Sequence, residues 1–283
     1  MKGKGVDSAE DLIKVRILPY ENKCFSVGKS MSQEDLVAIL LTLVQNLDVF
    51  AWSSYEVPGV DPEFITHKLN VDPLFPPKKQ KPRRSAKQHV EAMKEKVARL
   101  KQAEAIREVF FSKCLSNTVV VKKKNGKWQV CVNFIDLNRS CLKDSFLVSK
   151  IDQLVDAMCG HPRMSFLDAF QGYHQIVLVA EEHEKTSFIT PEGNYHYTVM
   201  PFKLKNARAT YKRMMTRMFR DKIGSIVEVY IDDMIVKSQE NHRHVKDLEE
   251  TFEILRQHKL CLNADKCAFG VGARKLLGYM ITN

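Results

Sequence analysis

Three aspartates are the residues whose types and spacing best fit a chemical role. Asp232 and Asp233 are adjacent within Ile226–Ile235, a run of high β propensity, and Asp168 follows the apolar segment Ser165–Leu167. Adjacent carboxylates repel each other, and divalent cations remove that repulsion. Three carboxylates at two neighbouring strand ends could hold two Mg²⁺ ions about 4 Å apart, as in-line phosphoryl transfer requires. The Asp-Asp dipeptide alone also fits an ordinary turn.

The elements that would position these aspartates are predicted from hydrophobic spacing. Apolar residues three and four apart indicate helices, whereas β-branched runs and an Asn-Gly pair at 125–126 indicate strands and a hairpin. Ser32 is expected to cap the first helix. The predicted strands are 118–121, 128–134, 165–168, 226–235 and 275–281, and the predicted helices are 32–50, 86–100, 151–158, 204–219 and 241–259. This irregular alternation predicts a mixed α+β fold.

The segment that precedes the predicted strands is rich in proline and then in positive charge. Residues 58–82 hold most of the chain's ten prolines, which predicts an extended connector rather than packed structure. Residues 76–102 carry ten Lys or Arg against two Glu and form the most basic segment. Forty-four Lys and Arg against 34 Asp and Glu give the whole chain a net charge of +10. This balance favours a polyanionic partner, although charge alone is a weak indicator.

The overall composition excludes several classes of protein. With 44% hydrophobic and 28% charged residues in 283, the chain is neither disordered throughout nor collagen-like. The longest apolar run, 37–44, is far shorter than the about 20 residues that span a membrane, and no secretory leader opens the chain. We therefore expect an intracellular protein with no membrane partner. Seven cysteines without a Cys-x-x-Cys pair indicate reduced thiols rather than a zinc site or disulfide framework.

Several motifs in a fixed order identify a known family. The chain contains SFLDAFQGYHQI at 165–176, MPFKLKNA at 200–207 and YIDD at 230–233. Further motifs are DVFAW at 48–52, HKLN at 67–70, VKKKNGKW at 121–128, DLN at 136–138, KCAFG at 266–270 and LLGY at 276–279. Together they resemble the reverse transcriptase (RNA-directed DNA polymerase) of gypsy-type long-terminal-repeat retrotransposon polyproteins, and plant elements most closely. The resemblance extends from about Asp11 to the end.

The resemblance implies a right-hand polymerase with an antiparallel palm sheet backed by helices. Residues 1–83 are then an N-terminal linker or extension with one helix, and residues 84–283 are the fingers and palm. The fingers are expected at about 84–150 and 180–205, and the palm at about 151–179 and 206–283. The thumb and ribonuclease H regions are expected to be absent, which implies low processivity. Residence in the cytoplasm (in a virus-like particle) or in the nucleus is likewise implied only by the resemblance.

The resemblance also implies roles for individual residues. Asp168, Asp232 and Asp233 would be catalytic and would hold two Mg²⁺ ions, or Mn²⁺, with the Ala169 carbonyl as a further ligand. The residues expected to bind the incoming dNTP are Lys123, Gln171, Gly172, Tyr173 and Phe202. Those expected at the RNA/DNA template–primer duplex are Lys203, Arg208, Tyr230, Leu277 and Gly278. Tyr173 would crowd the 2′ position of a ribonucleotide. From the residues alone, Tyr173 also fits the core and the Lys122–Lys124 triplet also fits a solvated face.

Seven positions depart from the family's pattern. They are Gln129 for Arg, Asn133 for Asp, Leu142 for Pro, Gln171 for a small residue, Lys203 for Gly, Arg208 for a small residue or Pro, and Lys212 for Gln. Replacing a planar cation at 129 with an amide loses a phosphate contact worth roughly 1.5–3 kcal/mol. The sequence therefore leaves two hypotheses, a working polymerase and a degenerate, non-catalytic nucleic-acid-binding remnant. A different two-metal nuclease or cyclase is disfavoured by the ordered motifs, and the oligomeric state stays open.

Overall fold

The computed structural model describes residues 11–17, 19–123, 126–146, 151–230, 233–272, 274–276 and 279–281. The chain divides into two compact units that alternate along the sequence. Unit 1 comprises Met1–Pro58, Phe146–Gly172 and Tyr211–Asn283, and unit 2 comprises Gly59–Ser145 and Tyr173–Thr210. The mixed α+β fold expected from the sequence is confirmed. Within the described residues, no helix is long and apolar enough to cross a bilayer.

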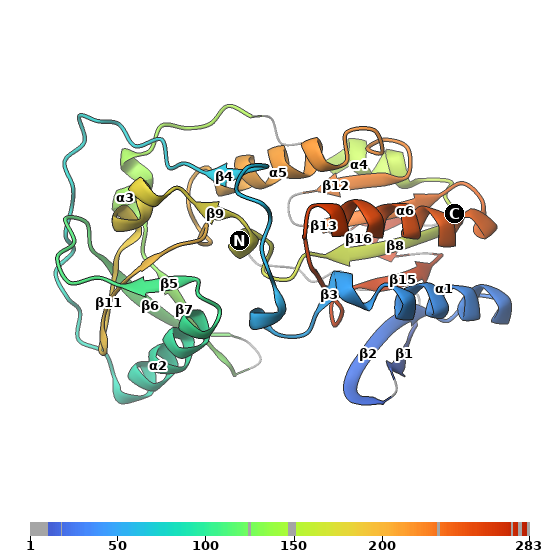
Figure 1. Ribbon diagram of the computed structural model, residues 1–283, viewed down its shortest axis with the longest axis horizontal. Coiled ribbons are helices and arrows are strands. Elements are labelled where there is room, and N and C mark those ends of the chain that lie inside the picture. The colour runs from blue at the N-terminus through green and yellow to red at the C-terminus, as the bar shows by residue number, and fades with distance from the viewer. Residues whose placement is uncertain are drawn as a thin grey trace. The chain divides into compact units, whose positions relative to one another are not determined.

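Unit 1 is built on a six-stranded sheet that gathers strands from distant parts of the chain (Figure 1). The order across the sheet is β1 (Leu12–Ile17), β2 (Tyr20–Gly28), β15 (Ala268–Val271), β8 (Arg163–Asp168), β13 (Asp233–Ser238) and β12 (Val227–Tyr230). Strand β8 is antiparallel to both of its neighbours, whereas β2 and β15 run parallel. The strand that ends at Asp168 is therefore held on both sides.

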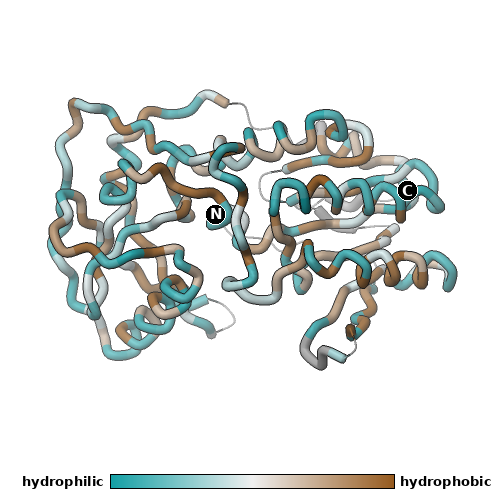
Figure 2. The backbone as a smooth tube through the Cα atoms, viewed as in Figure 1, coloured by the Kyte–Doolittle hydropathy of each residue, from teal (hydrophilic) through white to brown (hydrophobic). Residues whose placement is uncertain are grey.

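Alternating residues of β8 pack on opposite faces of this sheet, as the two-residue period of a strand requires. Met164 and Phe166 belong to an apolar cluster with Leu154 and Met158 of α4 (Ile151–Met158). On the other face, Ser165 lies 2.7 Å from a ring nitrogen of His244, the first residue of α6 (His244–Gln257). Figure 1 shows α6 lying along this sheet, and Figure 2 shows hydrophilic and hydrophobic residues alternating around it. The sheet is thus covered by helices on both faces.

Four phenylalanines fill the space between the sheet, α6 and the start of unit 1. Phe25, Phe50, Phe252 and Phe269 contact one another edge to face, with ring centroids 4.9–6.5 Å apart. Nearby, α1 (Gln33–Gln45) begins as predicted, because the Ser32 hydroxyl accepts a hydrogen bond from the Asp35 amide. The helix ends at Gln45 rather than near residue 50.

Shorter elements complete unit 1. The chain after α1 passes through η1 (Leu47–Val49) into β3 (Phe50–Ala51), which pairs in parallel with β14 (Leu262–Asn263). η2 (Ser54–Glu56) and η5 (Asn241–Arg243) are single turns, and β16 (Arg274–Leu276) and β17 (Tyr279–Ile281) form a hairpin. Helix α5 (Ala207–Met218) starts in unit 2 and continues in unit 1.

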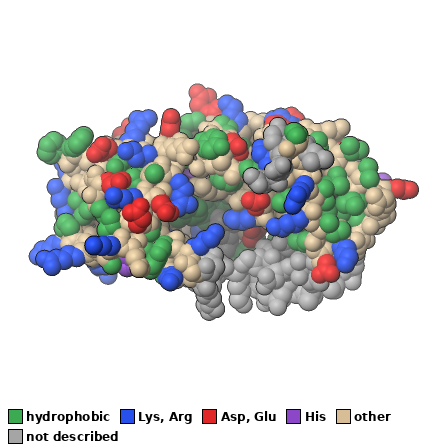
Figure 3. All heavy atoms as spheres, turned by 90° about the horizontal axis from the view of Figure 1, so that it is seen from below, with side chains coloured by type: hydrophobic (Ala, Val, Ile, Leu, Met, Phe, Trp, Pro, Cys, Tyr) green, Lys and Arg blue, Asp and Glu red, His purple; other side chains and the backbone are tan. Residues whose placement is uncertain are grey.

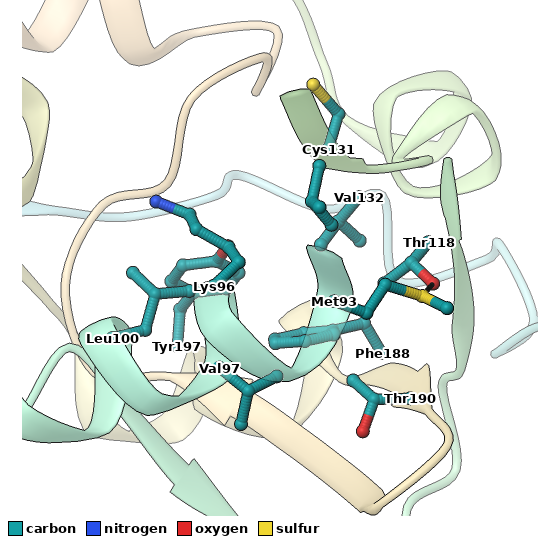
Figure 4. A pocket seen from close by; sticks show the side chains of 11 residues that line it. Met93, Lys96, Val97, Leu100, Thr118, Cys131, Val132, Phe188, Thr190 and Tyr197 are labelled. Atoms are coloured by element: carbon teal, nitrogen blue, oxygen red, sulfur yellow. Dashed lines mark hydrogen bonds between the residues drawn. The ribbon is translucent and has the colours of Figure 1, made fainter. Parts of the chain in front are cut away.

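Unit 2 contains a five-stranded sheet covered by one long helix. The strand order is β5 (Ile106–Glu108), β11 (Gly193–Tyr197), β10 (Phe188–Thr190), β6 (Ser116–Lys122) and β7 (Trp128–Val132). Helix α2 (Lys87–Gln102) turns Met93, Val97 and Leu100 towards Phe188 and Tyr197, around a residual space of only about 10 Å³ (Figure 4). This unit also has α3 (Ile135–Ser140), η3 (Gly172–Gln175), η4 (Ala180–Thr186) and the parallel pair β4 (Thr66–His67) and β9 (Val177–Leu178).

Two expectations for the first part of the chain need correction. The first part of the proline-rich segment is packed, since Val60, His67 and Leu69 are at most 1% exposed and β4 pairs with β9, whereas residues 73–79 are exposed. Its prolines leave the chain extended, but Val60 and Leu69 still reach the core, whereas Leu74 and Phe75 are exposed. Residues 11–83 also hold four strands besides the predicted helix: β1 pairs with β2, and β2, β3 and β4 pair with the distant β15, β14 and β9. The division into fingers and palm stays a prediction.

Candidate active site

Two of the three predicted aspartates face each other at one end of the unit 1 sheet. Asp168 is the last residue of β8 and Asp233 the first of β13, and the antiparallel register makes them direct partners. Tyr230, the last residue of β12, is the partner of Asp233 on its other side. Directly opposed residues have Cβ atoms about 4.5–5.5 Å apart, and like charges in that position destabilise a sheet. The register therefore concentrates negative charge at this point.

A lysine that the sequence analysis gave no role neutralises part of this charge. The Lys266 ammonium lies 3.0 Å from Oδ1 and 3.2 Å from Oδ2 of Asp168. The Asp168 side chain is 23% exposed and that of Lys266 is 61% exposed. Burial raises the pKa of the Asp168 carboxyl, and Lys266 acts in the opposite direction by stabilising the carboxylate. Lys266 belongs to a motif quoted above, but its contact with Asp168 has no signal in the sequence.

The donor set at this end of the sheet fits a divalent cation. Carboxylate oxygens are the preferred ligands of Mg²⁺, which in proteins often takes only one or two carboxylates and completes its shell with water and phosphate. Lys266 already places a positive charge against both oxygens of Asp168. Over the described ranges, no group of three His, Cys, Asp or Glu side chains is arranged as a metal site. Asp232, the third predicted ligand, lies outside the described residues.

The turn after β8 is held tightly against its neighbours. Ala169 forms an isolated bridge with Leu262, and Gln171 adopts a positive φ of 47°. A Cβ atom on Gly172 would lie 2.9 Å from a ring carbon of Tyr211 and 3.0 Å from the Cβ of Ala169, so this position has room only for glycine. A left-handed conformation is uncommon for a residue other than glycine.

Three aromatic rings of unit 2 lie together just after this turn in the sequence. The ring centroids of Tyr173 and Phe202 are 5.1 Å apart, and those of His174 and Phe202 are also 5.1 Å apart. Tyr173 is buried, whereas Phe202 is 47% exposed. Burial lowers the pKa of His174 to about 3, so its ring is neutral. The structure thus brings together two residues predicted to bind the nucleotide.

Lys203 follows this cluster in a conformation that explains the glycine of the family. Its φ is 73°, in the left-handed region that glycine adopts without a steric penalty. The Asn138 side-chain amide donates to the Lys203 carbonyl at 2.8 Å, and its oxygen accepts from the Lys205 amide at 2.8 Å. Asn138 therefore fixes the loop that carries Lys203, which is a role that the sequence analysis did not assign.

The remaining predicted residues lie on several different elements. Lys123 is exposed and directly follows β6 in the β6–β7 hairpin. Its amide donates to the Lys127 carbonyl at 2.9 Å. Gln129 and Arg208 are exposed on β7 and α5, and Tyr230 is half-buried against the α4 cluster. Leu277 and Gly278 lie outside the described residues. Lys123, Gln129, Tyr173, Phe202, Lys203 and Arg208 belong to unit 2, whereas the described candidates Asp168, Ala169, Gln171, Gly172, Tyr230 and Asp233 belong to unit 1.

Comparison with known proteins adds a decisive observation. The sequence model of the family described as "Reverse transcriptase (RNA-dependent DNA polymerase)" matches residues 121–281, more than half of the chain. The chain belongs to the reverse transcriptase family. This match includes both described aspartates and those of the ordered motifs that lie from residue 121 onward, so the predicted family is confirmed.

Individual relatives agree with this assignment. The chain is 32% identical over 206 residues to the Pol polyprotein of transposon 412 from Drosophila melanogaster, covering 71% of this chain and 17% of that polyprotein. It is 29% identical over 173 residues to the Pol polyprotein of transposon gypsy from the same species, covering 59% and 17%. The chain is therefore similar to the reverse transcriptase region of long-terminal-repeat retrotransposon polyproteins, and spans about a sixth of their length.

Solved structures confirm the fold. A foamy viral protease-reverse transcriptase in complex with an RNA/DNA hybrid superposes with a TM-score of 0.79 at 16% identity, over 89% of this chain and 33% of that one. Native prototype foamy virus protease-reverse transcriptase gives the same TM-score at 18% identity, over 90% and 33%. At these identities the likeness concerns the backbone, not the chemistry of individual side chains.

Proposed function

We propose that this chain carries the nucleotidyl-transfer centre of a retrotransposon reverse transcriptase. Its reaction would transfer the nucleotidyl group of a dNTP to the 3′-hydroxyl of a primer paired with an RNA or DNA template, with pyrophosphate as the leaving group. The observation that carries the proposal is the pairing of Asp168 with Asp233 at the ends of adjacent central strands. A sheet has no packing reason to oppose two carboxylates there, whereas phosphoryl transfer needs anionic ligands on a rigid support.

On this proposal, the metal would be held by Asp168, Asp232 and Asp233, with the Ala169 carbonyl as a further ligand. Two bound Mg²⁺ ions, or Mn²⁺, would supply an activated primer hydroxyl and neutralise the negative charge on the α-phosphate and pyrophosphate. The chain's contribution is to fix the carboxylates. β8 is paired on both sides, and the Cys267 thiol accepts a hydrogen bond from the Asp168 amide at 3.4 Å.

The nucleotide and the duplex would be bound by the other predicted residues. Tyr173 is proposed to exclude ribonucleotides, and its ring is already fixed by the contact with Phe202. Lys123 is proposed to meet the triphosphate from an exposed hairpin. Gln171, Gly172, Lys203, Arg208, Tyr230, Leu277 and Gly278 keep their proposed places along the nucleotide and the template–primer. Lys and Arg side chains are spread over the face in Figure 3, with Asp and Glu among them. Such a surface suits sequence-independent phosphate contacts.

Primer extension on an RNA template with dNTPs and Mg²⁺ or Mn²⁺ tests the proposal. We expect short products from the unaltered chain, and loss of at least about a hundredfold in rate for Asp168→Asn and Asp232→Asn, because each removes an anionic metal ligand. Duplex binding should survive both changes. The control is Asp221→Asn, an exposed aspartate between α5 and β12, which should extend primers normally.

The same experiment separates the alternative. A degenerate, non-catalytic remnant would bind the duplex and make no product under either metal. The replacements Gln129 and Lys203 favour that alternative, since both alter proposed substrate contacts. Extension that survives Asp168→Asn and Asp232→Asn would refute the assignment of these carboxylates.

A further inference from the structure

Lys266 reaches Asp168 from a turn that is fixed independently of the ion pair. The amides of Lys266 and Cys267 both donate to the Asn263 carbonyl at 3.1 Å. The next residue, Cys267, places its thiol against the backbone of Asp168 itself. Because the backbone on both sides of the ion pair is anchored, the proximity of the ammonium to the carboxylate is built into the fold.

The Lys266 ammonium contacts the same Asp168 oxygens that a metal would need as ligands. Its nitrogen is within 3.2 Å of both carboxylate oxygens of Asp168, so it uses lone pairs that face the ion pair. In the absence of metal, it also offsets the cost of opposing Asp168 to Asp233. A cation is therefore present at this carboxylate before any divalent ion arrives.

Lys266 differs from a structural lysine in the same unit. Lys237 is only 4% exposed, pairs with Glu228 at 2.9 Å and donates to the Ala157 carbonyl at 2.7 Å, so it is enclosed. The Lys266 side chain is 61% exposed. An exposed ammonium can move into water at little cost, because exposed ion pairs contribute little to stability. Lys266 can therefore leave Asp168 without unfolding its surroundings.

We propose that Lys266 is an exchangeable counter-ion of the active-site carboxylates, which a divalent cation must displace from Asp168. This inference rests on the metal site of the proposed function and adds a residue that sets its affinity. Competition of this kind raises the apparent dissociation constant of the metal. The apparent value is the intrinsic value divided by the fraction of molecules in which the ion pair is open. Removing the charge should therefore tighten metal binding, whereas removing an ordinary positioning residue would weaken it.

The test measures metal binding without any turnover. Metal-free full chain is titrated with Mn²⁺, and the free ion is quantified by electron paramagnetic resonance. We expect Lys266→Met to lower the Mn²⁺ dissociation constant by about two- to fivefold, as release of a partly exposed ion pair would give. Lys266→Arg keeps the charge and should stay near the unaltered value. Lys246→Met removes one charge from the exposed side of α6 and serves as the matched control.

The outcomes distinguish this inference from the proposed function. If Asp168→Asn retains the tight Mn²⁺ site, the metal assignment itself is wrong. If Asp168→Asn loses the site but Lys266→Met leaves the affinity unchanged or weaker, the metal site stands and the counter-ion role is refuted. Thermal unfolding gives an independent readout: metal-free Lys266→Met should unfold at a lower temperature, and Mn²⁺ should raise its midpoint more than that of the unaltered chain. Equal Mn²⁺ shifts in the two proteins would contradict the exchange.

Discussion

Lys203 is a residue type that is unfavourable for the backbone conformation it adopts. Its φ of 73° is a left-handed conformation, which costs a residue with a Cβ atom about 1–2 kcal/mol. Glycine would avoid this cost, but it would lose more backbone entropy on folding, which offsets part of the gain. We expect Lys203→Gly to raise the free energy of unfolding by up to about 1 kcal/mol, measured by urea denaturation.

The control for this prediction is Lys143→Gly. Lys143 is also exposed in a loop of unit 2 but is not among the residues with positive φ. Without strain to relieve, glycine there should lower stability or leave it unchanged. Stabilisation by both substitutions, or by neither, would show that the backbone at 203 carries no penalty.

At the scale of elements, α6 is joined to the central strands by a buried polar chain. Ser165 of β8 and Ser238 of β13 lie 2.7 and 2.8 Å from the two ring nitrogens of His244, and the Ser238 hydroxyl donates to Asp247 at 2.6 Å. All four side chains are nearly inaccessible. Burial, assisted by Arg163, lowers the pKa of His244 to about 3, so the folded chain keeps this ring neutral. The strands that end in Asp168 and begin with Asp233 are tied to the same helix.

This network makes a prediction about acid stability. An unfolded histidine has a pKa of about 6.5, so below that pH the unfolded chain binds a proton at this ring and the folded chain does not. The contribution of His244 is therefore complete above about pH 6.5 and declines as the pH falls towards 3. Between pH 6.5 and 5, His244→Gln should reduce the pH dependence of the unfolding free energy by about 0.7 kcal/mol per pH unit at pH 6.5, rising to about 1.4 at pH 5. Urea denaturation at several pH values measures it, and an unaltered slope would contradict a buried neutral ring.

The elements that sequence reasoning predicted are those whose information is local. α4 matches its predicted residues, and α2 and the hairpin β6–β7 differ from prediction by a few residues at their ends, because hydrophobic period and turn chemistry lie within one segment. β1 and β2 were not predicted, and the pairing of β2 with the distant β15 has no local pattern. In the same way, the order of motifs pointed to Asp168 and Asp233, whereas the contact of Lys266 with Asp168 depends on how two segments pack and has no local pattern.

For the whole molecule, the excess of positive charge bears on the affinity for nucleic acid. With a net charge of +10, duplex binding through phosphates should release counter-ions. We expect the affinity for a template–primer duplex to fall at least about tenfold between 50 and 200 mM salt, with a log–log slope of about −0.9 per phosphate contacted. Fluorescence anisotropy measures this, with sucrose at matched osmolality as the control. A dissociation constant that does not change with salt concentration would exclude the phosphate contacts.

The central sheet has a consequence for how the chain is made. β2 and β15 come from nearly opposite parts of the sequence, yet Val27 and Phe269 are paired. During translation β2 leaves the ribosome early and waits with an unpaired edge until β15 has been synthesised, which is a situation that favours aggregation. A stop codon before position 268 would leave all three aspartates in the product but deprive β8 of one neighbour. Shortened copies would therefore lose part of the support of Asp168 while still encoding all three aspartates of the proposed site.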